Sequence, residues 1–474
     1  MSNSKVSLKK AVLINSSGKY IRILLAIVVN AILSRILSPE EFGIIAIITV
    51  FSTFFNTLSD MGFGAAIIQK KDLTQYDINH IYSFTVYISV ILMMIFQVLS
   101  IPISFFYNDS VYIRLGFLLS LSLLFNTMNM VPNGMLNREK QFIKLAYRTI
   151  LSYLIPSIIA ILAAIIGLSF YSLVLQSILS SFILFIWNRV DYKLKFVIRI
   201  DLFSIKKVMN YSSYQFAFNV INYFSRNLDN LLTGKLLGNA ELGYYNKAYT
   251  LMLYPVNNLT GVVSPVLHPV LADYQSQYEL IYKKYMKVVC FLSALACFVT
   301  VFCWFNSYEL VVLMYGSNWA ESVICFEILS FAIFPQMLNS SAGAIFQVLG
   351  KTKLLFINGC INTAITVIAI IMGICLGGSI QCLSLGVAIA YILQFFCCYV
   401  MLIHAGFGFS FFDFLKAVLP DMVHMVVLFT AAYFWPFEIR NTLMAAGCKT
   451  IYLIAVYALL LVVSKRYKLL LDLF

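Results

Sequence analysis

The sequence predicts an all-α protein that crosses a membrane many times, and three observations lead to this fold class. Of the 474 residues, 61% are hydrophobic and only 11% are charged, whereas soluble proteins average about 25% charged residues. The apolar residues gather in runs of roughly 20 or more, the length of helix that crosses a hydrocarbon core. The runs are separated by short polar turns, and the chain repeats its opening pattern further on.

Apolar runs bounded by polar turns predict about 14 transmembrane helices. The first six are expected at residues 12–37, 42–68, 78–106, 111–136, 145–167 and 169–187. The next six are expected at 208–234, 242–270, 285–306, 323–348, 354–376 and 380–403. Two more are expected at 416–437 and 442–464.

An internal repeat predicts the organisation of these helices. Arg35–Gly43 (RILSPEEFG) is echoed by Lys235–Gly243 (KLLGNAELG). The echo predicts two pseudo-symmetric six-helix lobes, residues 1–206 and 207–404, followed by two further transmembrane helices and a tail at 405–474. A shift of six helices preserves orientation, so the lobes should be related by an axis along the membrane normal, around a central cavity.

Lysine and arginine predict the orientation. Most of them fall in the loops that lie on one side when the N-terminus is placed in the cytoplasm, and this bias places both termini there. The same loops account for most of the net charge of +13. Nucleic acid is therefore not expected as a partner, and the lipid bilayer is.

Polar residues line one face of several predicted spans, most densely in the first and the seventh. Stripes this polar face one another or a wet cavity rather than lipid. Hydrogen bonding between helices accounts for a lone Ser, Thr or Asn. It does not account for co-aligned stripes in six helices, one of which is Asn126, Asn129 and Asn133 in the fourth span. Arginine at membrane depth costs a few kcal/mol and favours a cavity. The candidate cavity residues are Lys19, Arg22, Asn30, Asn219, Asn222 and Arg226.

Two acidic residues are placed within predicted spans. Asp60 lies beside Gly62 and Gly64, where the helix is expected to loosen and admit water. It is the candidate for coupling to a proton or sodium gradient. Asp229, one turn from Arg226, is the candidate for positioning that arginine, and simple neutralisation of Arg226 is the alternative. If neither gradient matters, removal of the product outside sets the direction.

No catalytic constellation is found in the sequence. It contains no Walker-type nucleotide loop and no HExxH motif. The ten cysteines show no CxxC spacing and the four histidines are scattered, so neither a metal nor a cofactor is expected. A membrane glycosyl polymerase or ligase would need a substantial outer loop, and the longest one here, about residues 306–322, is too short. We therefore expect a protein that is not an enzyme.

The opening of the chain resembles a known family. Ser34–Gly43 (SRILSPEEFG) followed by Leu58–Lys70 (LSDMGFGAAIIQK) resembles the Wzx-type polysaccharide repeat-unit flippases, and residues 347–353 (QVLGKTK) fit the same pattern. These are polysaccharide biosynthesis transporters of the multidrug/oligosaccharidyl-lipid/polysaccharide exporter superfamily. The resemblance implies flipping of undecaprenyl-pyrophosphate-linked oligosaccharide across the bacterial cytoplasmic membrane by alternating access. It also implies possible contact with a polysaccharide polymerase and other assembly proteins.

Two related transporters remain as alternatives. A multidrug or cation antiporter of the same superfamily would want a membrane carboxylate in its first helix, where this chain has Arg22 and Asn30. A lipid II flippase also has 14 helices and a cationic cavity, but the opening motif fits the polysaccharide branch better. The resemblance identifies neither the sugar nor the coupling ion.

Overall fold

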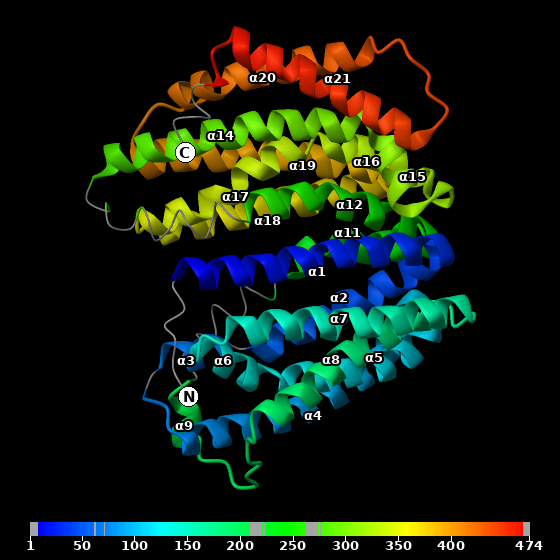
Figure 1. The fold of residues 1–474 in the computed structure, drawn as a ribbon, viewed down its shortest axis with the longest axis vertical. Helices are drawn as coiled ribbons and strands as arrows, with labels where there is room; N and C mark the ends of the chain where they lie inside the picture. Colours follow the sequence, from blue (N-terminus) through cyan, green and yellow to red (C-terminus); the bar gives the residue numbers. More distant parts are fainter. Residues whose placement is uncertain are drawn as a thin grey trace. The chain divides into compact units, whose positions relative to one another are not determined.

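The structure, a computed structural model, describes residues 8–60, 63–70, 72–208, 220, 223–261, 271, 274 and 277–467. Its regular structure is helical, with no β-strand among the described residues, as the predicted fold class requires. The helices form two compact units, Met1–Lys235 and Leu236–Phe474. In Figure 1 the first runs from blue to green and the second from green to red.

The first unit contains long helices joined by short turns. Its elements are α1 (Leu8–Ile36), α2 (Pro39–Asp60), α3 (Phe63–Gln69), α4 (Gln75–Tyr107), α5 (Val111–Met128), α6 (Met130–Arg138), α7 (Phe142–Ile165), α8 (Tyr171–Asp191), α9 (Leu202–Lys206) and most of α11 (Leu228–Leu236). Helix α1 packs along α7, α4 packs along α5, and α8 contacts both α5 and α7 (Figure 1).

Small residues allow these helices to approach closely. A Cβ atom added to Gly18 of α1 would lie 2.8 Å from the Cβ of Ala146 on α7. A Cβ atom on Gly116 of α5 would lie 2.3 Å from the Cβ of Ser100 on α4. In lipid, where helices gain nothing from burying apolar surface against one another, such close contact is a main source of helix association.

The second unit is built in the same way. Its elements are α12 (Asn239–Thr260), α14 (Tyr278–Phe305), α15 (Ser307–Tyr315), η1 (Ser317–Trp319), α16 (Glu321–Ser330), α17 (Ile333–Val348), α18 (Thr352–Cys375), α19 (Ile380–Val400), η2 (Met401–Phe407), α20 (Phe411–Tyr433) and α21 (Thr442–Val463). Helices α18 and α19 form one tightly packed pair and α14 and α20 another, while α21 contacts α20 and α15 (Figure 1).

The described helices follow many of the predicted spans, and one span is bent. Within the described residues, ten helices are long and apolar enough to cross a membrane, and one further pair, α16 and α17, meets the same test but is bent by 53°. The second predicted span consists of α2 and α3, and the fourth of α5 and α6. Many membrane-crossing helices are therefore present, and the total of fourteen stays a prediction.

Both copies of the sequence repeat form a short turn between two helices. The first copy joins α1, which ends at Ile36, to α2, which begins at Pro39; the second joins α11 to α12, from Leu236 to Asn239. In the first copy the Ser38 hydroxyl accepts the Glu41 N–H at 3.3 Å, and the Glu41 carboxylate accepts the Ser38 N–H at 2.6 Å. This reciprocal capping box fixes the start of α2. The repeat therefore encodes a tight turn between two helices.

The described part of the seventh predicted span packs on the first unit. The Tyr223 hydroxyl donates to the Val50 carbonyl at 2.5 Å, and the ring of Phe224 lies 4.7 Å from that of Phe54. The Tyr107 hydroxyl at the end of α4 donates to the Leu231 carbonyl at 3.0 Å. The first compact unit consequently extends to Lys235. The boundary at residue 207 was inferred from the repeat and stays a prediction about the two sequence halves.

A strap, residues 192–208, is fastened along the first half of α4. The side chains of Asn79 and Ser83 accept backbone N–H groups of the strap at 3.1 and 2.8 Å, and the Tyr87 hydroxyl donates to the Ile198 carbonyl at 3.2 Å. At its far end Lys207 forms an ion pair of 2.9 Å with Asp77, which is buried. The strap that joins the halves is therefore an ordered part of the first unit.

The turn of the strap around Asp201 has a local cause. The Asp201 carboxylate accepts the Phe203 N–H at 3.0 Å and the Ser204 hydroxyl at 2.9 Å. These hydrogen bonds hold the pKa of Asp201 below its ordinary value, because they stabilise the ionised form. The carboxylate caps the short helix α9.

Candidate functional site

Arg22 is the predicted site residue with the most informative position. It is the midpoint of the 29-residue helix α1, about 21 Å from either end at 1.5 Å per residue. Its side chain is exposed, and its guanidinium carbon lies 5.7 Å from the ring centroid of Tyr153 on α7. Helix α1 contains no acidic residue. Helix α1 is not among the candidate membrane spans of the described residues, so the position of Arg22 within the membrane stays a prediction; a cation placed there needs a polar environment.

The close packing of α1 on α7 explains where Arg22 lies. Gly18, one turn before it, contacts Ala146, and Tyr153 follows Ala146 by two turns on α7. The aromatic face is therefore brought beside the guanidinium, an arrangement that attracts a cation.

The other candidates on α1 are only partly described. Lys19 belongs to the helix, and its side chain lies outside the described part of the structure. The Asn30 amide oxygen accepts the Ser34 hydroxyl at 3.3 Å, along the same helix. Asn30 is half-buried.

The seventh predicted span contributes Arg226 and Asp229 to the described structure. Arg226 is exposed, in a helical turn that precedes α11. Asp229, in the first turn of α11, is 3% exposed, and its carboxylate accepts the Asn230 N–H at 2.8 Å. An acidic residue is favourable at this end of a helix. Asn219 and Asn222 lie outside the described residues.

Asp60 is the last residue of α2, and α3 begins at Phe63. Residues 61 and 62, where the helix is expected to loosen, lie outside the described residues. The side chain of Asp60 lies outside the described part.

The structure reveals a buried cation near the start of the fifth predicted span. Arg148 of α7 is 1% exposed. Its guanidinium donates to the amide oxygens of Asn188 on α8 and Asn133 on α6. Asn188 in turn donates to Asn129 at 2.6 Å, and Asn129 donates to the Ser181 carbonyl at 3.1 Å. These residues form the Arg148 network, which connects α6, α7 and α8.

The Arg148 network accounts for the polar stripe of the fourth predicted span. Asn129 and Asn133 bind other helices rather than a cavity, so hydrogen bonding between helices explains them. A partial signal was present in the sequence, because an asparagine stripe at membrane depth needs partners. Nothing in the sequence identifies Arg148, which lies in a different predicted span, as that partner.

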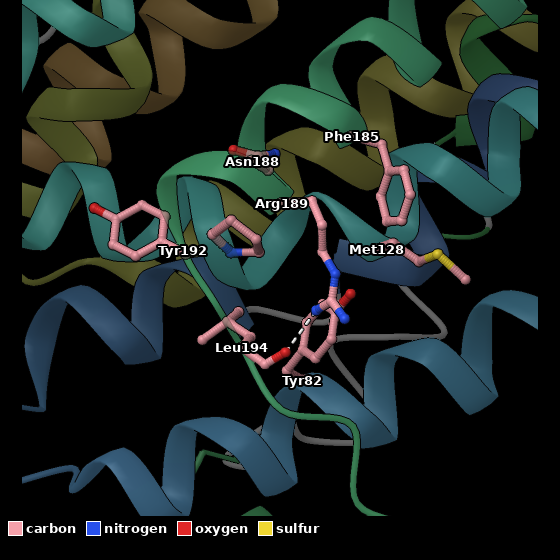
Figure 2. A pocket seen from close by; sticks show the side chains of 8 residues that line it. Tyr82, Met128, Phe185, Asn188, Arg189, Tyr192 and Leu194 are labelled. Carbon is pink, nitrogen blue, oxygen red and sulfur yellow. Dashed lines mark hydrogen bonds between the residues drawn. The ribbon is translucent and has the colours of Figure 1, made fainter.

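A small pocket lies beside this network, between α4, the α5–α6 junction, α8 and the strap (Figure 2). Arg189 extends into it and donates to the Leu194 carbonyl at 2.5 Å, and the rings of Tyr82 and Tyr192 form part of its wall. It has room for about one water molecule. The pocket is thus too small for a sugar or a pyrophosphate. Among the described residues there is also no group of three or more His, Cys, Asp or Glu side chains that could hold a metal ion.

Comparison with known proteins establishes the family. The family model described as "Polysaccharide biosynthesis protein" matches residues 32–324, more than half of the chain. The chain belongs to this family. The resemblance of the opening residues is thereby confirmed.

Two curated relatives support the same assignment. One, named "Uncharacterized membrane protein in cps region" from Klebsiella pneumoniae, is 26% identical over 70% of this chain and 69% of its own length. Another, named "Lipopolysaccharide biosynthesis protein WzxC" from Escherichia coli (strain K12), is 22% identical over 82% of this chain and 79% of its own length.

Among solved structures, the chain is similar to one titled "Lipid II flippase MurJ, inward closed conformation". The TM-score is 0.75, with 16% sequence identity, 96% of this chain and 99% of that chain covered. An inward-facing multidrug resistance MATE family transporter is similar with a TM-score of 0.58, at 13% identity over 85% of this chain and 96% of that chain. At these identities the likeness shows a shared fold.

Proposed function

We propose that this protein is a flippase that moves undecaprenyl-pyrophosphate-linked oligosaccharide repeat units from the inner to the outer leaflet of the bacterial cytoplasmic membrane. The units would belong to a capsule, an O-antigen or a similar exopolysaccharide. Family membership and a fold shared with a flippase support this function. The observation that carries it is Arg22, an exposed cation at the midpoint of a long helix without acidic residues. Such a cation lowers the cost of moving a pyrophosphate through hydrocarbon.

Within this proposal, Arg22 and Arg226 bind the pyrophosphate and Lys19 lies near the inner entrance. Asn30, Asn219 and Asn222 line the path of the substrate. Asp229 orients Arg226, and Asp60 takes part in coupling. Arg22 and Arg226 are both exposed members of the first compact unit.

We also propose fourteen spans, arranged as two lobes of six and a final pair, with both termini in the cytoplasm. The lobes alternate access to the two sides of the membrane. A polysaccharide polymerase on the outer side consumes the product.

The decisive experiment is flipping of a defined lipid-linked oligosaccharide in proteoliposomes. Arg22→Ala should abolish transport at normal protein level, and Arg22→Lys should retain part of it, because the charge is kept. Arg35→Ala is the matched control: Arg35 lies at the end of the same helix, where it donates to the Ala31 carbonyl at 3.0 Å. Wild-type rates in Arg22→Ala would remove Arg22 from the site.

The similarity to a lipid II flippase favours one alternative substrate. Proteoliposomes loaded with lipid II separate the two functions. Faster flipping of lipid II than of oligosaccharide repeat units would make lipid II the substrate. The role of Arg22 would then be tested with the same substitutions and lipid II.

A further inference from the structure

A buried acid in the second unit has no part in the site described above. Asp421, on α20, is 0% exposed, and neither of its carboxylate oxygens has a hydrogen-bond partner in the described structure. A carboxyl group in a dry site without hydrogen bonds is stabilised either by a cation or by a proton. The surroundings of Asp421 determine which of these is available.

The available cation is Arg466, three residues beyond the end of α21. Its Nη2 atom lies 3.6 Å from a carboxylate oxygen of Asp421, which is too far for a hydrogen bond. The same atom donates to the Ala417 carbonyl at 2.6 Å. Arg466 therefore contributes a nearby charge to Asp421, and its hydrogen bond goes to the backbone.

The other titratable or polar groups around the pair come from α14, α20 and α21. They are Cys290, Ser293 and Cys297 of α14, His424 of α20 and Tyr457 of α21. Two of their atoms, Ser293 Oγ and His424 Nδ1, also lack hydrogen-bond partners. The Tyr457 hydroxyl donates to the Ala294 carbonyl at 2.7 Å. These described neighbours include no second carboxyl group.

The position of Asp421 within a candidate membrane span indicates that the Asp421–Arg466 pair has a functional role. Asp421 lies ten residues beyond Phe411, the first residue of α20, or about 15 Å along the helix. Helix α20 is one of the candidate membrane spans. An ionisable residue at such depth marks an ion or proton pathway more often than it serves stability.

We propose that Asp421 is a proton-binding site, and that binding of the proton controls how strongly Arg466 is attracted to α20. A proton taken from water binds one carboxylate oxygen, so the negative charge that attracts Arg466 disappears. Arg466 then keeps only its bond to Ala417. Because Arg466 lies three residues beyond the end of α21, proton uptake weakens the attachment of this end of α21 to α20. The idea that this proton drives flipping rests on the proposed function. The idea that Asp421 binds a proton is independent of it.

The first test detects the proton directly. The probe is the infrared band of a protonated carboxyl group, recorded as the difference between acidic and neutral pH on the full-length protein in lipid. We expect a band that is lost in Asp421→Asn and retained in Asp413→Asn. Asp413 is the matched control, an exposed acid on the same helix, 3.8 Å from Lys416.

Persistence of the full band in Asp421→Asn would overturn the proposal. If that variant does not fold, Asp421→Glu decides, because a glutamic acid at this position should shift the frequency of the band. An unshifted band would then contradict the assignment.

The second test concerns coupling. In proteoliposomes that flip the oligosaccharide substrate, an imposed pH gradient should alter the wild-type rate and leave Asp421→Asn unaffected. An identical response in both proteins would refute the coupling role. Absence of flipping in the wild type would instead refute the proposed function, and the infrared band would still decide whether Asp421 binds a proton.

Discussion

Arg148 in the first unit and Arg466 in the second are both arginines at helix contacts, and their partners differ in kind. Arg148 donates to the amide oxygens of Asn133 and Asn188, and the Asn188 amide donates onward to Asn129. Arg466 lies near a carboxylate that accepts no hydrogen bond. An amide network does not change charge between pH 5 and 8, whereas a carboxyl–guanidinium pair loses its attraction when a proton arrives. The first arrangement is suited to holding helices together, and the second is suited to responding to a change in pH.

Replacement of Arg148 should give the largest loss of stability. Arg148→Met leaves the amide oxygens of half-buried Asn133 and buried Asn188 without this donor, a cost of about 2–4 kcal/mol for the pair. Thermal unfolding in detergent should show a clearly lowered Tm.

The matched control is Lys144→Gln, on the same helix. Lys144 is largely exposed and pairs with Asp191 at 3.1 Å, so its loss should cost less than about 1 kcal/mol. Equal effects of the two substitutions would contradict a structural role for the Arg148 network.

A substitution that loosens the strap should have an effect of intermediate size on stability. Lys207→Gln removes the cation that faces buried Asp77 and should weaken docking by about 1.4 kcal/mol, or tenfold. Trypsin should then cleave about tenfold faster after the exposed residues Lys193, Lys195 and Arg199. The neighbouring exposed Lys206, changed to Gln, serves as the control and should leave the rate unchanged. A slow rate in both variants would show that the backbone hydrogen bonds to α4 suffice.

Arg22 is also an arginine, but unlike Arg148 it is exposed. Its contact with Tyr153 is long, and at exposed sites such cation–π contacts contribute about 0.5–1 kcal/mol. Arg22→Gln should therefore lower stability by less than Arg148→Met does, although it should remove transport. A loss of stability as large as that of Arg148→Met would mean that Arg22 is structural.

The smallest effect is expected when both members of the second-unit pair are replaced. Asp421→Leu combined with Arg466→Met should change the free energy of unfolding by less than about 1 kcal/mol, or raise it, because both charges were desolvated with few hydrogen bonds. A destabilisation as large as that of Arg148→Met would show that Asp421 and Arg466 form a structural contact. The pair would then have the same role in the second unit as the Arg148 network has in the first.

Much of the fold follows from local sequence. Apolar runs of membrane length identified the helices, because backbone groups in lipid must pair within their own segment. The repeated turn was also local: the first copy is closed by Ser38 and Glu41, three residues apart. The bend of 53° between α16 and α17 falls inside one predicted span, where hydropathy continues although the direction of the helix changes.

The sequence by itself determined that this protein is a helical membrane protein of the polysaccharide biosynthesis family, and it predicts that Arg22 lies within the first span. Only the tertiary structure decided which polar residues meet. Arg148 and Asn188 are separated by 40 residues in the chain, and the partner of Asp421 lies beyond the following helix. The physical reason is that a polar group within a membrane must find a partner wherever helix packing supplies one, and that packing depends on small contacts such as Gly18 against Ala146.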